Sequence, residues 1–377
     1  MGTMNIDVKG NDFVVDYQFG FDFCKAIDTT RCKAKYVYLS CDGDNFIMHL
    51  MSDTLTVYAS SPAPGGKVFK LGVPAPKLVA LFKRLYPGSI IKFKPSKKDL
   101  LVQEDNIKVK LSAVNYKAPS QIAKFSYIEG PECEWLVESI SKCASALGDG
   151  KRFNGILIDN TSPYVGRVVN FTETAFRVCA ANKFSFGDYR MVITIDVAKA
   201  LKGFSDSITH LMVSPGKFGA YLKSGVCFFT PLMYDDLPNR YVESFGLQEQ
   251  AAQVDLSGRS YLFNKQRFAE VFEFVSSVIG SEESMIMCEI EGLTSQDQFP
   301  VWRLSAKTHN GCEASELVET LASGVTDMLP CRINKRSTVN TLKYHGEDII
   351  VLDKDETFLA ITDKDASDVT LLLKAPV

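Results

Sequence analysis

The stretch from Phe171 to Tyr241 decides the fold, and its first apolar run is Phe176-Arg177-Val178-Cys179-Ala180-Ala181. The stretch continues with Met191-Val192-Ile193-Thr194-Ile195, the helix-like Asp196-Val197-Ala198-Lys199-Ala200-Leu201-Lys202, and the closing run Phe228-Phe229-Thr230-Pro231-Leu232-Met233-Tyr234-Asp235-Asp236-Leu237-Pro238. β-branched and aromatic runs of this length are typical of strands, and apolar residues spaced by three or four are typical of helices. The same order of elements occurs once before this stretch and once after it, which indicates three related copies of one fold.

The two outer copies show the same alternation of strands and amphipathic helices. The apolar spacing predicts helices over 19–35 and 75–85 in the first copy, 134–144 and 196–202 in the second, and 264–279 and 335–344 in the third. Asp42-Gly43 lies between two β-rich runs, which is a strong signal for a hairpin turn. In the helix over 264–279, Phe274 falls outside the stripe of apolar residues expected to be buried.

The copies start near residues 1, 127 and 250, so the repeat is roughly 125 residues long. Solenoid repeats run only about 20–50 residues, so these copies are whole domains. We therefore expect an α+β protein of three repeated domains, over 1–126, 127–249 and 250–377, each with two helices packed on antiparallel sheets.

The bulk composition fits a soluble globular protein. Hydrophobic residues make up 46% of the 377 residues and charged residues 23%, and the net charge is −3. The first residues lack a basic-then-apolar signal pattern, and no apolar run approaches the roughly 18 residues that span a bilayer. We expect no membrane association and a location in the bacterial cytoplasm or in a phage-infected host cell.

The ten cysteines do not indicate a metal site. No C-x-x-C pair is present and the four histidines do not cluster near the cysteines, whereas zinc sites need ligands at short, fixed spacings. Cys179, Cys227 and Cys288 lie inside apolar runs and are predicted to be reduced, buried side chains. We expect no metal and no cofactor.

The sequence gives no sign of catalysis. It contains no phosphate-binding G-x-x-x-x-G-K-[ST] loop, no G-x-G-x-x-G after a strand, no H-E-x-x-H and no G-x-S-x-G. Asp42-Gly43-Asp44-Asn45 is too short for a calcium loop and fits a hairpin turn better. A binding protein without enzymatic activity is therefore expected, with two alternatives. One is a non-catalytic β-rich viral structural or assembly protein with three similar domains, and the other is a nuclease with scattered carboxylates.

Several motifs, in their order and spacing, resemble the bacterial DNA polymerase III beta subunit, the sliding-clamp family. They are Phe153-Asn154-Gly155-Ile156-Leu157, Phe229-Thr230-Pro231-Leu232 with Leu237-Pro238-Asn239-Arg240-Tyr241, Cys331-Arg332-Ile333-Asn334 before a helix, and the tail Leu371-Leu372-Leu373-Lys374-Ala375-Pro376-Val377. The resemblance covers essentially the whole chain. It departs from the family where A-T-D-G-H-R-L is replaced by Ala180-Ala181-Asn182-Lys183-Phe184-Ser185-Phe186, which indicates a diverged member such as a phage encodes.

The resemblance implies a head-to-tail homodimer whose six domains form a ring around double-stranded DNA, without sequence readout. It implies as partners a DNA polymerase, a clamp loader and other replication or repair proteins that carry a clamp-binding peptide. The trimeric clamps of eukaryotes and archaea have two domains per chain, so three repeats favour a dimer.

Basic side chains on inner helices would supply the salt-sensitive attraction to phosphates that such a ring needs. Those on or beside the expected helices are Lys25, Arg31, Lys33, Lys77, Lys83, Arg84, Lys142, Lys199, Lys202, Lys265, Arg267, Lys335, Arg336 and Lys343, and Lys151 and Arg152 would lie at the channel mouth. Acidic residues cluster mostly elsewhere, at 235–236, 282–283 and 353–356. For any single residue, the solvated face of an amphipathic helix is an alternative explanation.

The resemblance also implies a peptide pocket between the second and third domains and an interface between the first domain of one chain and the third of the next. The matching pocket positions are Phe153, Ala181, Phe184, Phe186, Pro238, Val242, Leu371, Leu373 and Ala375. The interface candidates are Val109, Leu111, Phe272 and Phe274. Core packing is the alternative for each of these apolar residues.

Overall fold

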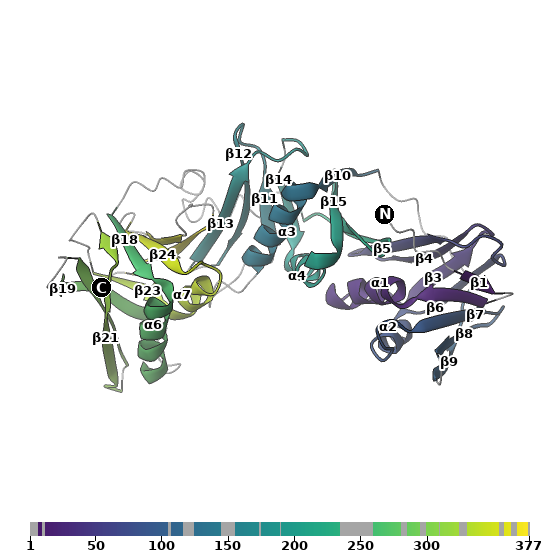
Figure 1. Cartoon of the computed structure of the whole chain (residues 1–377), viewed down its shortest axis with the longest axis horizontal. Coiled ribbons are helices and arrows are strands. Elements are labelled where there is room, and N and C mark those ends of the chain that lie inside the picture. The colour runs from purple at the N-terminus through teal and green to yellow at the C-terminus, as the bar shows by residue number, and fades with distance from the viewer. Residues whose placement is uncertain are drawn as a thin grey trace. The chain divides into compact units, whose positions relative to one another are not determined.

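The structure is a computed structural model that describes residues 7–9, 12–104, 107–115, 124–144, 155–172, 175–188, 190–233, 259–279, 285–294, 299–308, 310–323, 330–353, 358–362 and 368–375. Figure 1 shows the helices and strands of the whole chain, which divides into two compact units. Unit 1 comprises Met1–Ser141 and Ile193–Met233, and unit 2 comprises Lys142–Val192 and Tyr234–Val377. The α+β class is confirmed, whereas the boundaries of the three predicted domains stay a prediction.

Unit 1 contains two antiparallel sheets. The first has the order β1 (Asp7–Lys9), β2 (Asp12–Asp16), β7 (Ile90–Pro95), β8 (Asp99–Glu104) and β9 (Ile107–Ser112). The second has the order β10 (Ser126–Glu129), β15 (Ile208–Ser214), β16 (Lys217–Leu222), β17 (Val226–Pro231), β5 (Thr56–Pro62), β4 (Asn45–Met51), β3 (Tyr36–Cys41) and β6 (Phe69–Pro74). Because β17 pairs with β5, strands of the predicted first and second domains share one sheet.

Three helices of unit 1 lie together. They are α1 (Tyr17–Thr29), α2 (Ala75–Phe82) and α4 (Ile195–Gly203), the last followed by a short 3-10 turn, η1 (Ser205–Ser207). Helix α1 contacts both α2 and α4 (Figure 1). The close approach of α1 to α2 depends on Gly20, because a Cβ there would lie 2.3 Å from the Phe82 ring. A further helix, α3 (Gly130–Ala144), begins in unit 1 directly after β10.

The first helix is shorter than the sequence predicts. It was expected over 19–35 but ends at Thr29, because Arg31 adopts a left-handed backbone with φ +52°. The backbone N–H of Arg31 donates to Asp28 O at 3.1 Å and that of Cys32 donates to Ile27 O at 3.1 Å. This pair of bonds is a Schellman motif, which ends a helix by satisfying its last carbonyls.

Unit 2 also contains two antiparallel sheets. The larger has the order β14 (Arg190–Thr194), β11 (Gly155–Asp159), β12 (Val165–Phe171), β13 (Ala175–Asn182), β26 (Asp368–Leu373), β25 (Phe358–Thr362), β24 (Asp348–Asp353), β18 (Arg259–Asn264) and β22 (Ala322–Ser323). The smaller has the order β21 (Glu313–Glu319), β20 (Pro300–Lys307), β19 (Met285–Leu293) and β23 (Cys331–Asn334). Two helices, α6 (Lys265–Ile279) and α7 (Lys335–Leu342), pack together within this unit.

Strand β13 of the predicted second domain pairs with β26 of the predicted third, and a buried ion pair lies on this strand pair. Arg177, which has no exposed surface, donates from Nε and Nη2 to the two carboxylate oxygens of Asp368, at 3.2 and 2.7 Å. Its guanidinium also lies over the Tyr344 ring, 4.9 Å from the centroid. A planar, two-point contact of this kind fixes the register of the two strands as well as compensating the buried charges.

Within the described ranges, no helix is both long and apolar enough to cross a membrane. Eight of the ten cysteines are buried, including Cys179, Cys227 and Cys288 as predicted. Burial raises the pKa of Cys227 to about 12, so this thiol stays protonated near neutral pH.

Candidate nucleic-acid and peptide interfaces

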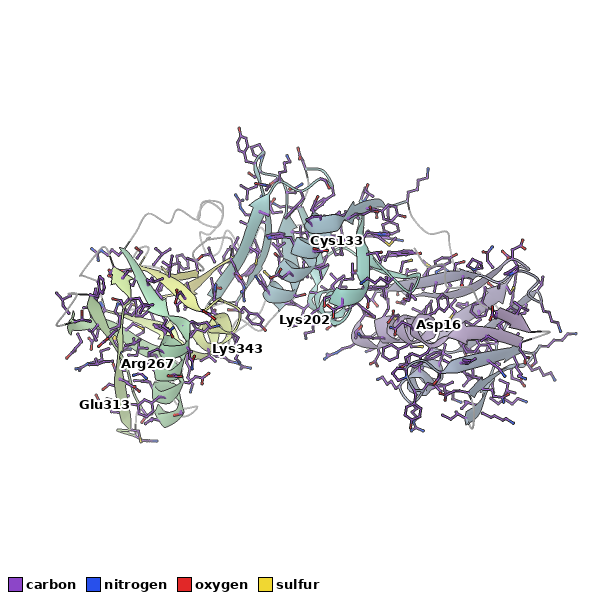
Figure 2. All side chains as sticks on the ribbon, viewed as in Figure 1. Asp16, Cys133, Lys202, Arg267, Glu313 and Lys343 are labelled. Carbon is purple, nitrogen blue, oxygen red and sulfur yellow. The ribbon has the colours of Figure 1, made fainter. Side chains whose placement is uncertain are left out.

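Most of the basic residues predicted in unit 1 are exposed and belong to neighbouring helices. They lie on α2 and at its end, on α4, where Figure 2 labels Lys202, and in the loop that follows α1. The exposed members are Arg31, Lys33, Lys77, Lys83, Arg84, Lys199 and Lys202. Asp28 is the exposed carboxylate on α1, and it forms an ion pair with Lys83 at 2.7 Å. Positive charge therefore predominates on this group of helices.

Lys25 has a different position. Its Nζ donates to Gly203 O at 2.5 Å and lies 4.4 Å from the centroid of the Phe204 ring. The lysine thus links α1 to the end of α4 and is only half-exposed. Its visible role is to hold two helices together.

In unit 2, several predicted basic residues are occupied by internal partners. Lys265 donates to His345 O at 2.7 Å, and Lys335 donates to Ser276 O at 2.8 Å. Arg267 on α6 pairs with Glu316 at 2.7 Å, and Lys142 lies 3.6 Å from Asp368. Arg336 and Lys343 are exposed on α7 and at its end, where Figure 2 labels Lys343.

Not every helix is basic. Helix α3 exposes Glu134 and Glu138, so the expectation that acidic residues cluster on other segments does not hold for it. Lys151 and Arg152 lie outside the described residues. Among the described residues, exposed basic side chains on the helices are therefore more numerous in unit 1, because several of those in unit 2 bond to backbone carbonyls or pair with carboxylates.

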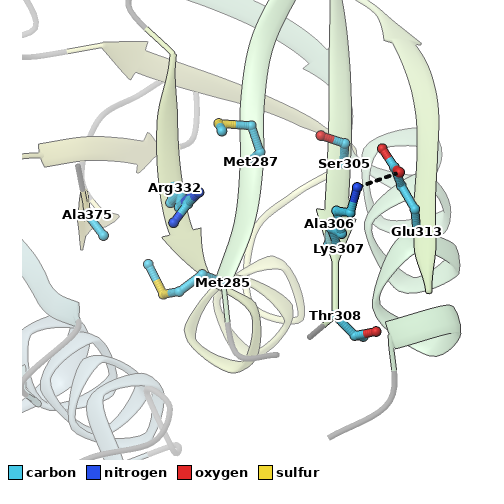
Figure 3. A pocket seen from close by; sticks show the side chains of 9 residues that line it. All are labelled: Met285, Met287, Ser305, Ala306, Lys307, Thr308, Glu313, Arg332 and Ala375. Atoms are coloured by element: carbon cyan, nitrogen blue, oxygen red, sulfur yellow. Dashed lines mark ion pairs between the residues drawn. The ribbon is translucent and has the colours of Figure 1, made fainter. Parts of the chain in front are cut away.

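A pocket of about 420 Å³ lies in unit 2, on the smaller sheet (Figure 3). We call it the methionine pocket. It is lined by Met285, Met287, Ser305, Ala306, Lys307, Thr308, Glu313, Arg332 and Ala375. Arg332 of β23 is paired with Met287 of β19 on one side and with Ala375 on the other.

The methionine pocket combines an adaptable apolar wall with charged side chains. Methionine side chains are unbranched and polarizable, so they adjust to irregular apolar ligands. Arg332 and Lys307 offer positive charge, and Glu313 pairs with Lys307 at 3.5 Å. Such a pocket suits a short peptide with apolar side chains and a carboxylate.

Among the predicted pocket residues whose side chains the structure describes, Ala375 is the one that lines the methionine pocket. Ala181 is half-buried at the end of β13. Phe153, Pro238 and Val242 lie outside the described residues, as do the side chains of Leu371 and Leu373 on β26. The sequence analysis did not identify Met285 and Met287. They alternate along β19 with Ile286 and Cys288, which are buried, so both methionines lie on the opposite face of the strand.

Phe184 and Phe186 pack inside their own loop. They are 4% and 8% exposed, and their rings stack with centroids 5.4 Å apart. Asn160 holds the loop, because its side chain accepts from Phe184 N at 2.8 Å and donates to Phe184 O at 2.9 Å and to Gly187 O at 2.7 Å. The Phe184 ring lies against Gly166, where an added Cβ would come within 2.5 Å. The Phe184 ring therefore fills the space that Gly166 leaves, and the Phe186 ring stacks on it.

Two edge strands are candidates for an interface between copies. Strand β9 ends the first sheet of unit 1, and β21 ends the smaller sheet of unit 2. Lys108 and Lys110 are exposed on β9, whereas Glu313 and Glu319 are exposed on β21, so the two edges carry opposite charge.

The four predicted interface residues differ in accessibility. Phe274 is 49% exposed on α6, beside β21, and Val109 is half-buried on β9. Leu111 and Phe272 are only 2% and 0% exposed, so they pack into the core of their own chain. Phe274 and Val109 are the two that offer surface to another copy.

Among the described residues, no group of three or more His, Cys, Asp or Glu side chains could hold a metal ion. The arrangement offers charged helices, an apolar pocket and two sheet edges, which are features of binding surfaces.

No protein-family model matches the sequence, and no curated protein does. Solved structures do match over nearly the whole chain. The DNA polymerase sliding clamp from Pseudomonas aeruginosa has a TM-score of 0.77 at 12% identity, covering 97% of this chain and 100% of that one. The DNA polymerase III subunit beta from Bartonella birtlesii gives 0.74 at 14% identity, covering 97% and 100%. The sliding clamp from Caulobacter crescentus gives 0.74 at 13% identity, covering 98% and 100%. The chain therefore has the sliding-clamp fold.

Proposed function

We propose that this chain is a DNA sliding clamp, a processivity factor that encircles duplex DNA and tethers a polymerase. The observation that carries the proposal is the extent of the fold match, which covers 97% of this chain and all of the Pseudomonas aeruginosa clamp. The two chains share their architecture but only 12% of their residues, so the function must also be argued from the side chains of this chain.

The exposed lysines and arginines of the unit 1 helices support the DNA-binding part of the proposal. Lysine and arginine side chains attract the phosphates of the DNA backbone, and this attraction does not depend on the base sequence. With Arg336 and Lys343 in unit 2 they form our proposed DNA contact set. Such a protein holds DNA by topology and charge, so no chemical step is needed.

The methionine pocket supports the tethering part. A polymerase, a clamp loader or a repair protein would insert a short peptide whose apolar side chains meet Met285 and Met287. Arg332 would pair with a peptide carboxylate. The β26 residues Leu371 and Leu373, which precede Ala375, stay proposed neighbours of this site, whereas Ala181 lies towards the opposite end of the β13–β26 pair.

The opposite charges of β9 and β21 support a head-to-tail homodimer. Edge strands expose unpaired backbone N–H and C=O groups, which a second copy can satisfy. We propose that β9 of one copy meets β21 of the next, with Phe274 covered by the contact. Closing two such joints makes a ring.

The test is topological. The full chain is mixed with a linear duplex, the duplex is circularised by ligation, and the complex is passed through gel filtration at high salt, which removes charge-only binding. We expect a native mass of two chains and retention on the circle that is lost after one restriction cut. A monomer whose DNA binding ignores circularity would contradict the proposal and favour a structural or assembly protein.

A further inference from the structure

Two buried cysteines face each other beside the methionine pocket. Cys288 of β19 and Cys331 of β23 are direct partners in the antiparallel register of the smaller sheet. Both are free thiols, with 0% and 4% of their surface exposed. They belong to the core of unit 2, whereas their neighbours Met287 and Arg332 line the methionine pocket. A buried cysteine usually acts as a small apolar side chain, but two partnered thiols can also react with each other.

The two thiols are not equivalent. The pKa of Cys331 is lowered because the Cys288 S–H donates to its sulfur and because Lys374 is positively charged. Burial and the Asp353 carboxylate oppose these effects without reversing them. Lys374 is held in place by an ion pair with Asp353, in which the two side chains are 6% and 7% exposed. The same hydrogen bond, together with burial, raises the pKa of Cys288. Cys331 is therefore the thiol that reacts as a thiolate, and Cys288 keeps its proton.

The strand geometry suits a disulfide between the two cysteines. Directly opposed residues of an antiparallel pair have Cα atoms about 4.5–5.5 Å apart, within the range of about 4.4–6.8 Å found in disulfides. Their Cβ atoms are about 4.5–5.5 Å apart, whereas a disulfide needs about 3.5–4.5 Å, so the two strands must move closer together. A bond that needs this movement is easily reduced, which is the property of a regulatory disulfide.

The movement reaches the pocket through the next pair of the same ladder. Met287 is the partner of Arg332, and each is adjacent in sequence to one of the cysteines. Figure 3 shows both side chains at the pocket. Arg332 is also bonded to Ala375, since its N–H donates to Ala375 O at 3.3 Å and its carbonyl accepts from Ala375 N at 2.9 Å. Pulling β23 towards β19 therefore displaces Met287, Arg332 and Ala375 relative to the rest of the pocket.

We propose that Cys288 and Cys331 are a redox modification site. A small-molecule disulfide oxidises them to a reversible disulfide, and the oxidised chain binds peptides more weakly at the methionine pocket. The second statement rests on the proposed function of that pocket, whereas the first does not. Strand β23 ends the smaller sheet, and local opening of this edge strand gives the reagent access to Cys331.

The reaction proceeds by two thiol–disulfide exchanges. The Cys331 thiolate attacks one sulfur of the reagent, the S–S bond of the reagent breaks, and its other half leaves as a thiolate that takes up the proton released by Cys331. Cys288 then attacks the Cys331 sulfur of the mixed disulfide, and the second half of the reagent leaves with the proton of Cys288. Two protein thiols are oxidised by two electrons in total, and one reagent disulfide is reduced to two thiols.

The first test is the mass of the full chain after treatment with hydroxyethyl disulfide, a small reagent that leaves methionine intact. We expect the chain to lose two hydrogen atoms, with the bond mapped to Cys288 and Cys331 by digestion, and to regain them in dithiothreitol. Cys288→Ala should stop at the mixed disulfide and gain one hydroxyethylthio group on Cys331. Cys331→Ala lacks the attacking thiol, so its Cys288 should stay reduced.

The second test is the affinity of the reduced and oxidised chains for a fluorescein-labelled pentapeptide of leucine and serine that ends in a free carboxylate. We expect oxidation to weaken binding about fivefold. Because such coupling is reciprocal, saturating peptide should shift the thiol–disulfide equilibrium towards the two thiols by the same factor.

Cys179→Ala is the matched control, because the Sγ of Cys179 lies 4.0 Å from that of Cys143 in a second buried pair of thiols. This variant should form the Cys288–Cys331 bond and lose affinity as the wild type does. Cys331→Ala should bind the peptide equally with and without the reagent.

The outcomes separate the two proposals. If the chain binds the peptide but does not lose the two hydrogen atoms, or if the bond maps to other cysteines, the redox site is excluded. If the bond forms and the affinity does not change, the cysteines do not regulate the pocket. If Cys179→Ala abolishes the effect and Cys331→Ala does not, Cys143 and Cys179 are responsible instead. If the reduced chain does not bind the peptide, the tethering function fails, and the mass alone decides whether the redox site exists.

Discussion

His49 shows how burial alone makes a single residue pH-sensitive. It lies on β4 with 6% of its surface exposed, and its Nε2 has no hydrogen-bond partner among the described residues. The Tyr58 ring packs edge-on against the imidazole ring, with the two ring centroids 5.5 Å apart. Because burial disfavours the charged imidazolium, the pKa of His49 is lowered from 6.5 to about 4.

This shift predicts how stability depends on pH. Between pH 6.5 and about 4, His49 is protonated in the unfolded chain but stays neutral in the folded chain. The free energy of unfolding that His49 contributes above pH 6.5 is therefore lost as the pH falls towards 4. The loss attributable to His49 is at most about 3 kcal/mol. Urea unfolding at about pH 7 and about pH 4.5, compared between wild type and His49→Phe, measures it. Equal pH dependence in both proteins would show that His49 does not contribute.

Arg177 illustrates a buried charge that only its partner makes tolerable. Arg177→Ala leaves Asp368, which is 2% exposed, without its two-point partner. We expect a loss of about 3–5 kcal/mol in unfolding free energy, and partial recovery in Arg177→Met/Asp368→Leu. Lys110→Ala, which breaks an ion pair at a side chain that is 70% exposed, should change little. Equal effects from the buried and the exposed pair would contradict this account.

At the scale of elements, the α1–α2 pair is set by one glycine. A Cβ on Gly20 would lie 2.3 Å from Cζ of Phe82, a ring that is 1% exposed and packs against Phe93 at 6.5 Å. The ring cannot swing away without disturbing the core below it. The close approach of α1 to α2 thus depends on the absence of a side chain at Gly20.

We therefore expect Gly20→Ala to cost about 1–3 kcal/mol by overpacking. Phe82→Leu in the same chain should recover part of that loss, because it removes the atoms that clash. The measurement is a double-mutant cycle in urea. Additive losses in the double variant would show that Gly20 and Phe82 do not determine the helix packing.

At the scale of the whole molecule, each unit contains a pair of neighbouring strands that come from distant parts of the sequence. Strand β17 pairs with β5 in unit 1, and β13 pairs with β26 in unit 2. We propose the same kind of strand pairing between two copies, with β9 of one copy beside β21 of the next. A joint between copies lacks the chain connection, so it is the weakest and the easiest to break.

Phe274→Ser should therefore shift the native mass from two chains to one at micromolar concentration, without lowering the melting temperature of the monomer. Its side chain is 49% exposed, so the substitution removes little core packing. Tyr164→Ser is the control, since that side chain is 81% exposed in the turn between β11 and β12. A dimer that survives Phe274→Ser but not Tyr164→Ser would place the interface elsewhere.

The sequence by itself determined the kind and order of the elements. Helices such as α6 and strands such as β13 follow from spacings of apolar residues within one segment, and a repeated order implies a repeated fold. The same local logic identified the buried cysteines Cys179, Cys227 and Cys288, because each lies within an apolar run.

Only the tertiary structure decided which side chains are available. Lys265 and Lys335 look like Lys77 in sequence, yet they donate to the carbonyls of His345 and Ser276. Phe184 and Phe186 look like binding residues in a loop, yet the Phe184 ring packs against Gly166, the Phe186 ring stacks on Phe184, and Asn160 accepts from the backbone N–H of Phe184. Partners of this kind are brought together by strand pairing across many residues. The periodicity of one segment carries no information about the carboxylate, carbonyl or glycine that another segment will place beside it.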